Sequence, residues 1–284
     1  MSLRELLART PVVGRASMVV YRAGLASRYL SGPLANAFYL LFRSKETTNF
    51  TYQLAPRNVK HLAAFVSVVA GCSYDEAVGY IAEVEGDNEL RSHISTVTAK
   101  SEYRHTADTT AYYGRRIGWY AIARVGKPKV TVETGVDKGL GACILTAALR
   151  RNAEEGHEGK YYGVDIDPKA GYLLRGDYAE HGEVVYADSL EFLRTFDGVV
   201  DFFINDSAHT EEHEGSEYRM VSDKLSPASV VIGDNAHGTD ELLEFAQRTG
   251  RRFLYFQEKP HAHWYPGGGI GAAFVTTTGS RISR

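Results

Sequence analysis

The chain has 284 residues, of which 44% are hydrophobic and 24% are charged, and it contains two cysteines. Two cysteines, Cys72 and Cys143, exclude a disulfide framework and a cysteine-rich zinc site. The longest apolar candidate for a membrane span, residues 17–43, is interrupted by two arginines and a proline. The composition therefore predicts a globular, cytoplasmic protein made of one large domain, or of one domain with an extension.

The net charge of −3 is unevenly distributed along the chain. Residues 1–60 contain nine basic and two acidic residues and carry +7, so residues 61–284 carry −10. A basic segment can contact a membrane surface or nucleic acid, but it can also be a solvated extension or a face that binds a partner chain. Because the acidic remainder repels phosphate, we expect no nucleic-acid partner. A weak membrane-surface contact and a homodimer stay open as roles of this segment.

Residues 1–110 are predicted to form a helical N-terminal region, which precedes a second domain at 111–284. Apolar residues recur at helical spacing, and Ser73 precedes two acidic residues as a helix N-cap does. Helices are predicted at 58–71, 73–86 and 108–126. This region is expected to supply a lid, a dimer face or contacts to an acceptor.

From residue 129 onward, short β-branched segments alternate with helical ones. Strands are predicted at 129–135, 161–167, 182–189, 200–206, 228–235, 251–258 and 269–278. Helices are predicted at 141–151, from Pro168, at 190–196, after 206 and at 239–250. The alternation predicts an α/β, Rossmann-like, seven-stranded, mostly parallel sheet with helices on both faces. The last two strands have no helix between them, so one of them is expected to be antiparallel.

Polar residues and glycines follow the first three predicted strands. The segment "VETGVDKGLG", residues 132–141, ends the first strand and opens a helix, and its glycines let the backbone approach a ligand. The second and third strands end in residues that can accept hydrogen bonds from a nucleoside. Ligands of open α/β sheets bind beyond the carboxyl ends of the strands. The candidate cofactor-binding residues are Glu133, Gly135, Gly139, Gly141, Asp165, Asp188 and Ser189.

The same glycine loop also fits the TGxxxGxG pattern of short-chain dehydrogenases, which are NAD(P) oxidoreductases. A Tyr-x-x-x-Lys pair is present at Tyr255 and Lys259. This pair lies in a strand-like segment near the C-terminus, whereas a dehydrogenase needs it on a mid-domain helix. The dehydrogenase is therefore kept only as an alternative.

Residues 110–284 resemble the class I S-adenosylmethionine-dependent methyltransferases. The resemblance rests on the glycine loop, on "GVDID" with Asp165, on "YADS" with Asp188 and on the two closing strands. That family has a seven-stranded sheet with an antiparallel strand near its end, which agrees with the predicted strands. The resemblance implies S-adenosyl-L-methionine as the cofactor. It also implies that the glycine loop holds the methionine moiety, Asp165 the ribose, and Asp188 with Ser189 the adenine.

Carboxylate and amide groups follow the next two strands. Asp206 ends the fourth strand, and Asp234 with Asn235 ends the fifth. Neighbouring strand ends bring these side chains close together, and three oxygen ligands with open positions suit Mg²⁺. The set resembles the metal ligands of the catechol O-methyltransferase group, including the 28-position interval between the two aspartates.

His209 stands three positions after Asp206, where the catechol O-methyltransferase group has a lysine. Asp-x-x-His is instead similar to the sugar O-methyltransferases of macrolide biosynthesis, in which the histidine is the general base. Those enzymes carry an acidic pair on the fifth strand, where this chain has Asp234 and Asn235, so the acceptor class stays open. His209 is the first candidate for the general base and His237 the second.

The predicted function is a Mg²⁺-dependent O-methyltransferase acting on a hydroxyl of a small molecule or glycan, such as a sugar, polyol or natural product. One alternative is a metal-independent methyltransferase with a nitrogen or carboxylate acceptor. Another is a binding or assembly protein that keeps the fold without turnover. A nucleic-acid methyltransferase is disfavoured, because no Asn-Pro-Pro-Tyr-like motif follows the fourth strand and the second domain is acidic.

Overall fold

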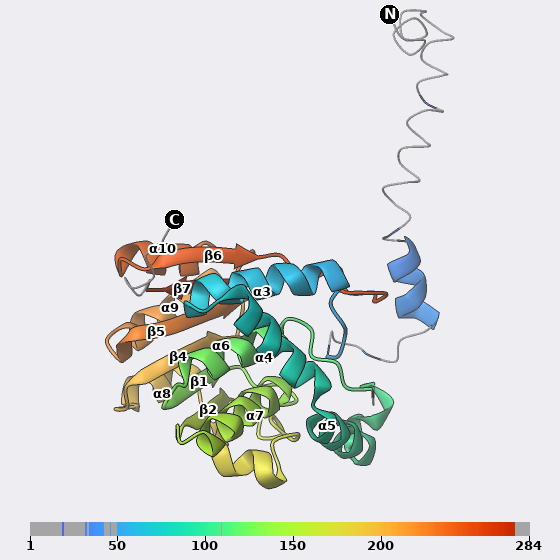
Figure 1. Cartoon of the computed structure of the whole chain (residues 1–284), viewed down its shortest axis with the longest axis horizontal. Helices are drawn as coiled ribbons and strands as arrows, with labels where there is room; N and C mark the ends of the chain where they lie inside the picture. The colour runs from blue at the N-terminus through green and yellow to red at the C-terminus, as the bar shows by residue number, and fades with distance from the viewer. Residues whose placement is uncertain are drawn as a thin grey trace, which may run out of the picture.

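The computed structural model describes residues 50–108 and 110–275, together with residues 19, 32, 34–42 and 46. The described residues form a seven-stranded sheet with the strand order β3-β2-β1-β4-β5-β7-β6 (Figure 1). The strands are β1 (Val130–Thr134), β2 (Lys160–Asp165), β3 (Gly182–Tyr186), β4 (Val200–Asn205), β5 (Leu225–Asp234), β6 (Arg252–Phe256) and β7 (Ile270–Phe274). The predicted Rossmann-like α/β class is therefore confirmed.

The strand directions place a ligand-binding edge at the middle of the sheet. β1 pairs in parallel with both β2 and β4. On the two outer sides, β2 pairs in parallel with β3, and β4 pairs in parallel with β5. β7 is antiparallel to β5 and to β6, as predicted for one of the last two strands. The strand order reverses between β1 and β4. In open α/β sheets, ligands bind beyond the carboxyl ends of the strands at such a reversal.

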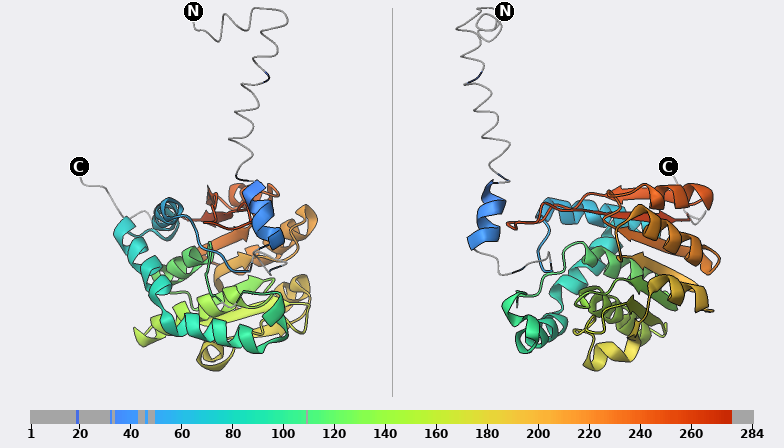
Figure 2. Two further views of the ribbon diagram at one scale, coloured as in Figure 1. Left: turned by 90° about the vertical axis from the view of Figure 1, so that its right-hand side faces the viewer. Right: turned by 180° about the vertical axis from the view of Figure 1, so that it is seen from behind.

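Helices cover both faces of the sheet, and each face has its own hydrophobic core (Figure 2). Side chains alternate along β4, so Phe202 and Ile204 pack in the first core and Phe203 packs in the second. The first core contains residues of α3 (Pro56–Ala70), α4 (Tyr74–Gly86), α6 (Arg116–Gly126) and α7 (Leu140–Glu154). The second contains residues of α8 (Ser189–Thr195), α9 (Glu211–Ser222) and α10 (Glu241–Arg248).

The helical N-terminal region shares the first core with the sheet domain. Leu62 of α3 and Ile81 of α4 are buried in the same cluster as Ile144 of α7. Ser73 caps α4 as predicted, in a capping box with Glu76. The region is thus fastened to the face of the sheet that α6 and α7 cover.

The helix predicted at 108–126 is shorter than expected, because it begins at Arg116. Tertiary contacts hold the preceding residues in another conformation. The hydroxyl of Thr51 donates to the carbonyl of Thr110 at 3.0 Å, and Gly114 has a φ of 52°, outside the right-handed helical region. These contacts override the local helical pattern.

Two further segments differ from the expectation. The sequence pattern did not predict α5 (Asn88–Lys100), although Asp87 caps it by accepting a hydrogen bond from the Leu90 N–H. The helix predicted from Pro168 is wrong: this segment forms turns and then the 3-10 helix η2 (Gly176–His181). Its Gly171 has a φ of 71°, which interrupts a helix.

A short helix at 34–42, drawn in blue in Figure 1, presents apolar side chains to solvent. Leu34, Phe38, Leu41 and Phe42 are each more than half exposed. Within the described residues no single helix is long and apolar enough to cross a membrane, and α3 with α4 meets the criterion only as a pair bent by 117°. Much of the basic segment lies outside the described residues. Its membrane contact and the homodimer therefore stay predictions.

Candidate active site

A cavity of about 620 Å³ opens at the carboxyl edge of the sheet, around the reversal of the strand order. Residues that follow or end β1, β2, β3, β4 and β5 all contribute to its lining. Eight of the twelve candidate site residues line this cavity, which is where the fold predicts a ligand. They are Gly135, Asp165, Asp188, Ser189, Asp206, His209, Asp234 and Asn235.

The glycine loop between β1 and α7 forms one wall of the cavity. Gly135 has a φ of 82°, and a Cβ there would collide with the backbone carbonyl of Asp206. The Asp165 carboxylate accepts from the backbone N–H groups of Val136 at 2.9 Å and Asp137 at 3.1 Å. It also accepts from the N–H two positions after it, at 2.9 Å. Because a carboxylate has about four acceptor sites, Asp165 organises the loop and keeps about one site for a ribose hydroxyl.

Asp188 and Ser189 lie after β3 as predicted, and both side chains also have partners within the protein. Asp188 caps α8 by accepting from the Glu191 N–H at 3.0 Å. The Ser189 hydroxyl is 3.1 Å from Nε2 of His213, and the same nitrogen is 3.1 Å from Glu217. Since one ring nitrogen faces both groups, these residues do not form a nucleophilic triad, which uses the two opposite nitrogens. A binding role for Ser189 fits this geometry better.

The other three candidate cofactor ligands lie outside the lining of this cavity. Gly139 is the N-cap of α7, and Gly141 lies in its first turn, packed against Glu133. Glu133 is 1% exposed and accepts a hydrogen bond from the Tyr161 hydroxyl. Burial raises the pKa of Glu133 from 4.5 to about 7. Direct contact between these three residues and a cofactor stays a prediction.

The raised pKa of Glu133 predicts a pH-dependent loss of stability. The folded state holds the Glu133 proton more tightly than the unfolded state, so the contribution of Glu133 to stability is greatest below pH 4.5 and is lost as the pH rises through about 7. We expect Glu133→Gln to remove this fall and to raise the free energy of unfolding at pH 8 by up to about 3 kcal/mol. Urea unfolding at pH 5 and pH 8 would measure it. Glu244→Gln, at an exposed position of α10, is the control, and identical pH dependence in the two variants would contradict the prediction.

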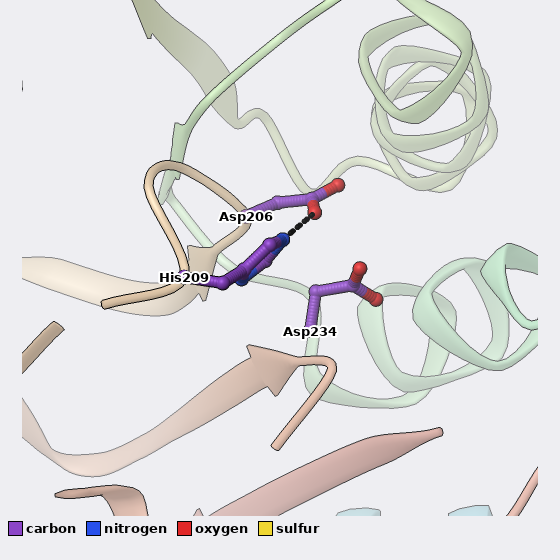
Figure 3. Close-up of side chains that lie close together, drawn as sticks. All are labelled: Asp206, His209 and Asp234. Carbon is purple, nitrogen blue, oxygen red and sulfur yellow. Dashed lines mark ion pairs between the residues drawn. The ribbon is translucent and has the colours of Figure 1, made fainter. Parts of the chain in front are cut away.

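Asp206, His209 and Asp234 converge on one point of the cavity (Figure 3). One ligand atom from each lies within 4.8 Å of the others. Nε2 of His209 is 3.7 Å from Asp206 and 3.2 Å from the amide nitrogen of Asn235. Nδ1 of the same ring is 3.5 Å from the buried carboxylate of Glu214.

Burial, and then the charge of Asp234, raises the pKa of Asp206. Two adjacent carboxylates of this kind need positive charge or a shared proton between them.

Arg115, directly before α6, supplies part of that positive charge. It is 2% exposed and donates to both carboxylate oxygens of Asp234. It also lies 3.2 Å from Glu258, in the loop between β6 and β7. Burial alone would raise the pKa of Asp234, but the Arg115 charge holds it below its usual value. The neighbouring Arg116 is 3.7 Å from Asp206, so two guanidinium groups face the two acids.

Neither arginine was a candidate site residue, although both line the cavity. The only signal in the sequence is a pair of adjacent basic residues, Arg115 and Arg116, at the start of an apolar helix. Their acidic partners lie up to 143 positions away. No local spacing rule connects residues so far apart, and only the fold brings them together.

His237, the second candidate for the general base, lies outside the lining of this cavity and is exposed. Its ring centroid is 6.5 Å from that of Tyr255 on β6. Tyr255 donates to the carbonyl of Gly268 at 2.9 Å and is not on a helix. The structure therefore does not form the Tyr-Lys arrangement that the dehydrogenase alternative requires.

Residues 132–236 match the family model described as "Methyltransferase domain". The matched segment runs from β1 to the turn after β5 and contains every candidate site residue except His237. This segment is therefore similar to methyltransferase domains, which agrees with the predicted methyltransferase assignment. No curated protein matches the sequence of this chain.

Several solved structures are similar to this chain at low sequence identity. The O-methyltransferase TomG from Streptomyces achromogenes, involved in tomaymycin synthesis and solved in complex with SAM, is 15% identical, with a TM-score of 0.48 over 65% of this chain and 90% of that chain. A putative caffeoyl-CoA O-methyltransferase from Staphylococcus aureus is 12% identical, with a TM-score of 0.49 over 69% and 99%. A methyltransferase from Geobacter sulfurreducens is 14% identical, with a TM-score of 0.48 over 68% and 94%.

Proposed function

We propose that this chain transfers the methyl group of S-adenosyl-L-methionine to a hydroxyl oxygen of a small molecule or glycan. The observation that carries the proposal is that one cavity is lined both by residues suited to a nucleoside and by residues suited to an acceptor hydroxyl. Asp165, the last residue of β2, and Asp188, after β3, suit the nucleoside of the cofactor. Asp206 and His209, after β4, suit an acceptor hydroxyl. The strand order puts the glycine loop of β1 between the two groups, where the transferred methyl group would lie.

When bound, S-adenosylmethionine supplies a methyl group on a sulfonium sulfur. The acceptor oxygen forms the new C–O bond while the C–S bond breaks, and the sulfur keeps the electron pair. His209 takes the hydroxyl proton, so the products are a methyl ether, adenosylhomocysteine and a protonated imidazole. Glu214, 3.5 Å from Nδ1, favours the tautomer with its proton on Nδ1 and leaves Nε2 as the base. Much of the rate would come from positioning the two reactants.

A divalent cation, Mg²⁺ by its preference for oxygen ligands, would be held by Asp206, Asp234 and Asn235. The two carboxylates fit, since the ligand atoms of Asp206 and Asp234 lie within 4.8 Å of each other, whereas Asn235 faces His209 with its amide nitrogen and would have to turn to offer its oxygen. Arg115 uses one acceptor site on each Asp234 oxygen, and a carboxylate has about four. When bound, such a cation lowers the pKa of an acceptor hydroxyl.

The same structure also supports a metal-independent methyltransferase. Arg115 and Arg116 already place two positive charges beside the two carboxylates. In that case the guanidinium groups would orient the acids, and His209 alone would take the proton. The two possibilities make opposite predictions about a chelator.

Methyl transfer from labelled S-adenosylmethionine to metabolite and glycan fractions tests the function. For the metal-dependent form, we expect EDTA to abolish turnover and added Mg²⁺ to restore it, with adenosylhomocysteine affinity unchanged. Asp206→Asn should lose the Mg²⁺ stimulation, and it is preferable to an Asp234 variant because it leaves the Arg115 ion pair in place. Full activity after exhaustive EDTA treatment would establish the metal-independent form. Cofactor binding without transfer to any fraction would favour a binding protein.

Asp165→Ala is expected to weaken adenosylhomocysteine binding by at least about tenfold. The variant loses one ligand contact and the three backbone hydrogen bonds that order the glycine loop, and hydrogen bonds to a charged group contribute about 1.5–3 kcal/mol each. Titration calorimetry measures the affinity. Asp177→Ala, at an exposed position on η2, is the control. Unchanged affinity would remove Asp165 from the site, and tighter binding of NAD than of adenosylhomocysteine would overturn the assignment of the cofactor.

A further inference from the structure

Arg116 carries hydrogen-bond donors that have no partner among the residues that the structure describes. Its Nε and Nη1 atoms are buried and unpaired, and its side chain is 14% exposed. Its closest ionic contact, from Nη2 to Asp206 at 3.7 Å, is too long for a hydrogen bond. Buried polar groups in folded proteins are nearly always paired. Since Arg116 lines the cavity, its free donors indicate a ligand with acceptor oxygens there.

The Arg116 side chain is held in one place before any ligand binds. Its guanidinium carbon lies 5.3 Å from the centroid of the Trp119 ring, one helical turn further along α6. Trp119 is fully buried and packs beside Gly141 at the start of α7. An arginine stacked on a buried aromatic ring has lost most of its rotamer freedom, so little more is lost when it binds a ligand.

Arg116 also lies at a defined position along the cavity. It faces Asp206 at the end of β4, and the Asp206 backbone contacts Gly135 of the glycine loop. The strand order β3-β2-β1-β4 therefore places Arg116 beyond the glycine loop from Asp165. If Asp165 binds the ribose, the amino-acid end of the same cofactor points toward Arg116.

We infer that Arg116 binds the amino-acid carboxylate of S-adenosylmethionine, an inference that rests on the proposed function. Nη2 forms a pair of parallel N–H donors with either Nε or Nη1, and such a pair matches the two oxygens of a carboxylate. The contact gives one of the two unpaired donors its acceptor. It also fixes the end of the cofactor that is nearest the sulfonium, and so directs the methyl group toward His209.

Two probes that differ in the amino-acid group test this inference. S-adenosylhomocysteine carries the carboxylate, whereas 5′-methylthioadenosine has the same nucleoside and sulfur without it. For Arg116→Gln we expect adenosylhomocysteine affinity to fall by about tenfold or more, with methylthioadenosine affinity changed less than about twofold. Arg116→Lys should recover part of the loss, because it keeps the charge without the planar fork. Arg248→Gln, an exposed arginine of α10, is the matched control.

The outcomes separate this inference from the proposed function. If wild-type protein binds neither probe, the proposed function fails. If it binds both and Arg116→Gln weakens them equally, or weakens neither, Arg116 does not bind the carboxylate and the inference is wrong. A variant that weakens only adenosylhomocysteine, with a melting temperature equal to that of the control, supports it.

Discussion

Replacing His209 by alanine should lower kcat by about 10²–10⁴-fold, which is the usual cost of losing a general base. The His209 ring lies in the cavity, with Nε2 3.7 Å from Asp206 and Nδ1 3.5 Å from Glu214. In the proposed reaction Nε2 faces the acceptor, while Nδ1 is held against a buried carboxylate. Adenosylhomocysteine affinity should stay within about twofold of wild type, because proton transfer involves the acceptor and not the cofactor. Steady-state kinetics and calorimetry would measure the two quantities separately.

The pH dependence of the rate distinguishes loss of a base from loss of packing. Wild-type activity should fall on the acidic side of its profile, since a protonated imidazole cannot accept a proton. His209→Ala should lose that acidic limb. His237→Ala is the matched control, because His237 is exposed and lies outside the lining of the cavity. A larger rate loss in the His237 variant would transfer the base role to it. Small, equal losses would mean that proton removal depends on neither histidine.

The sheet was predictable from sequence because its signals are local. Strands such as 200–206 are apolar runs that end in polar residues, and β4 (Val200–Asn205) reproduces that range within a residue. The site residues at strand ends followed from the same logic, since parallel strands bring their carboxyl ends to one edge. Asp206 and Asp234, 28 positions apart in sequence, thus meet in one cavity as expected.

The errors arise where distant contacts decide the local structure. The sequence around 108–115 has a helical pattern, but its hydrogen bonds are made to Thr51, more than fifty positions away. The helix predicted from Pro168 was wrong for a different reason, since Gly171 adopts a positive φ that a helix cannot contain. Arg115 was missed because its partners, Asp234 and Glu258, follow it by more than a hundred positions. Charge neutralisation inside a cavity is a property of the fold, and sequence spacing does not report it.

The ion pair of Arg115 and Asp234 should be among the largest single contributions to the stability of this site. Both side chains are at most 3% exposed, and Arg115 donates to both carboxylate oxygens. Removing one partner of a buried ion pair typically costs about 3–5 kcal/mol, and in an Asp234 variant Glu258, 3.2 Å from Arg115, still compensates part of the arginine charge. We therefore expect Asp234→Asn to lower the free energy of unfolding by about that amount, although the side chain keeps its shape. Urea unfolding followed by circular dichroism would measure it.

A double-mutant cycle with Arg115→Met isolates the pair from other effects. The double variant should be less destabilised than the sum of the two single variants. Each single variant keeps one buried charge of the pair, whereas the double variant keeps neither. Glu258 also faces Arg115 at 3.2 Å, so the Arg115→Met single variant should be the more destabilised of the two. The exposed pair of Arg248 and Glu244, 3.6 Å apart on α10, is the control cycle, with an expected coupling below about 1 kcal/mol. Strictly additive effects at Arg115 and Asp234 would mean that the two charges do not interact in solution. The metal-independent alternative would then lose its main support, which is the arginine charge beside the two carboxylates.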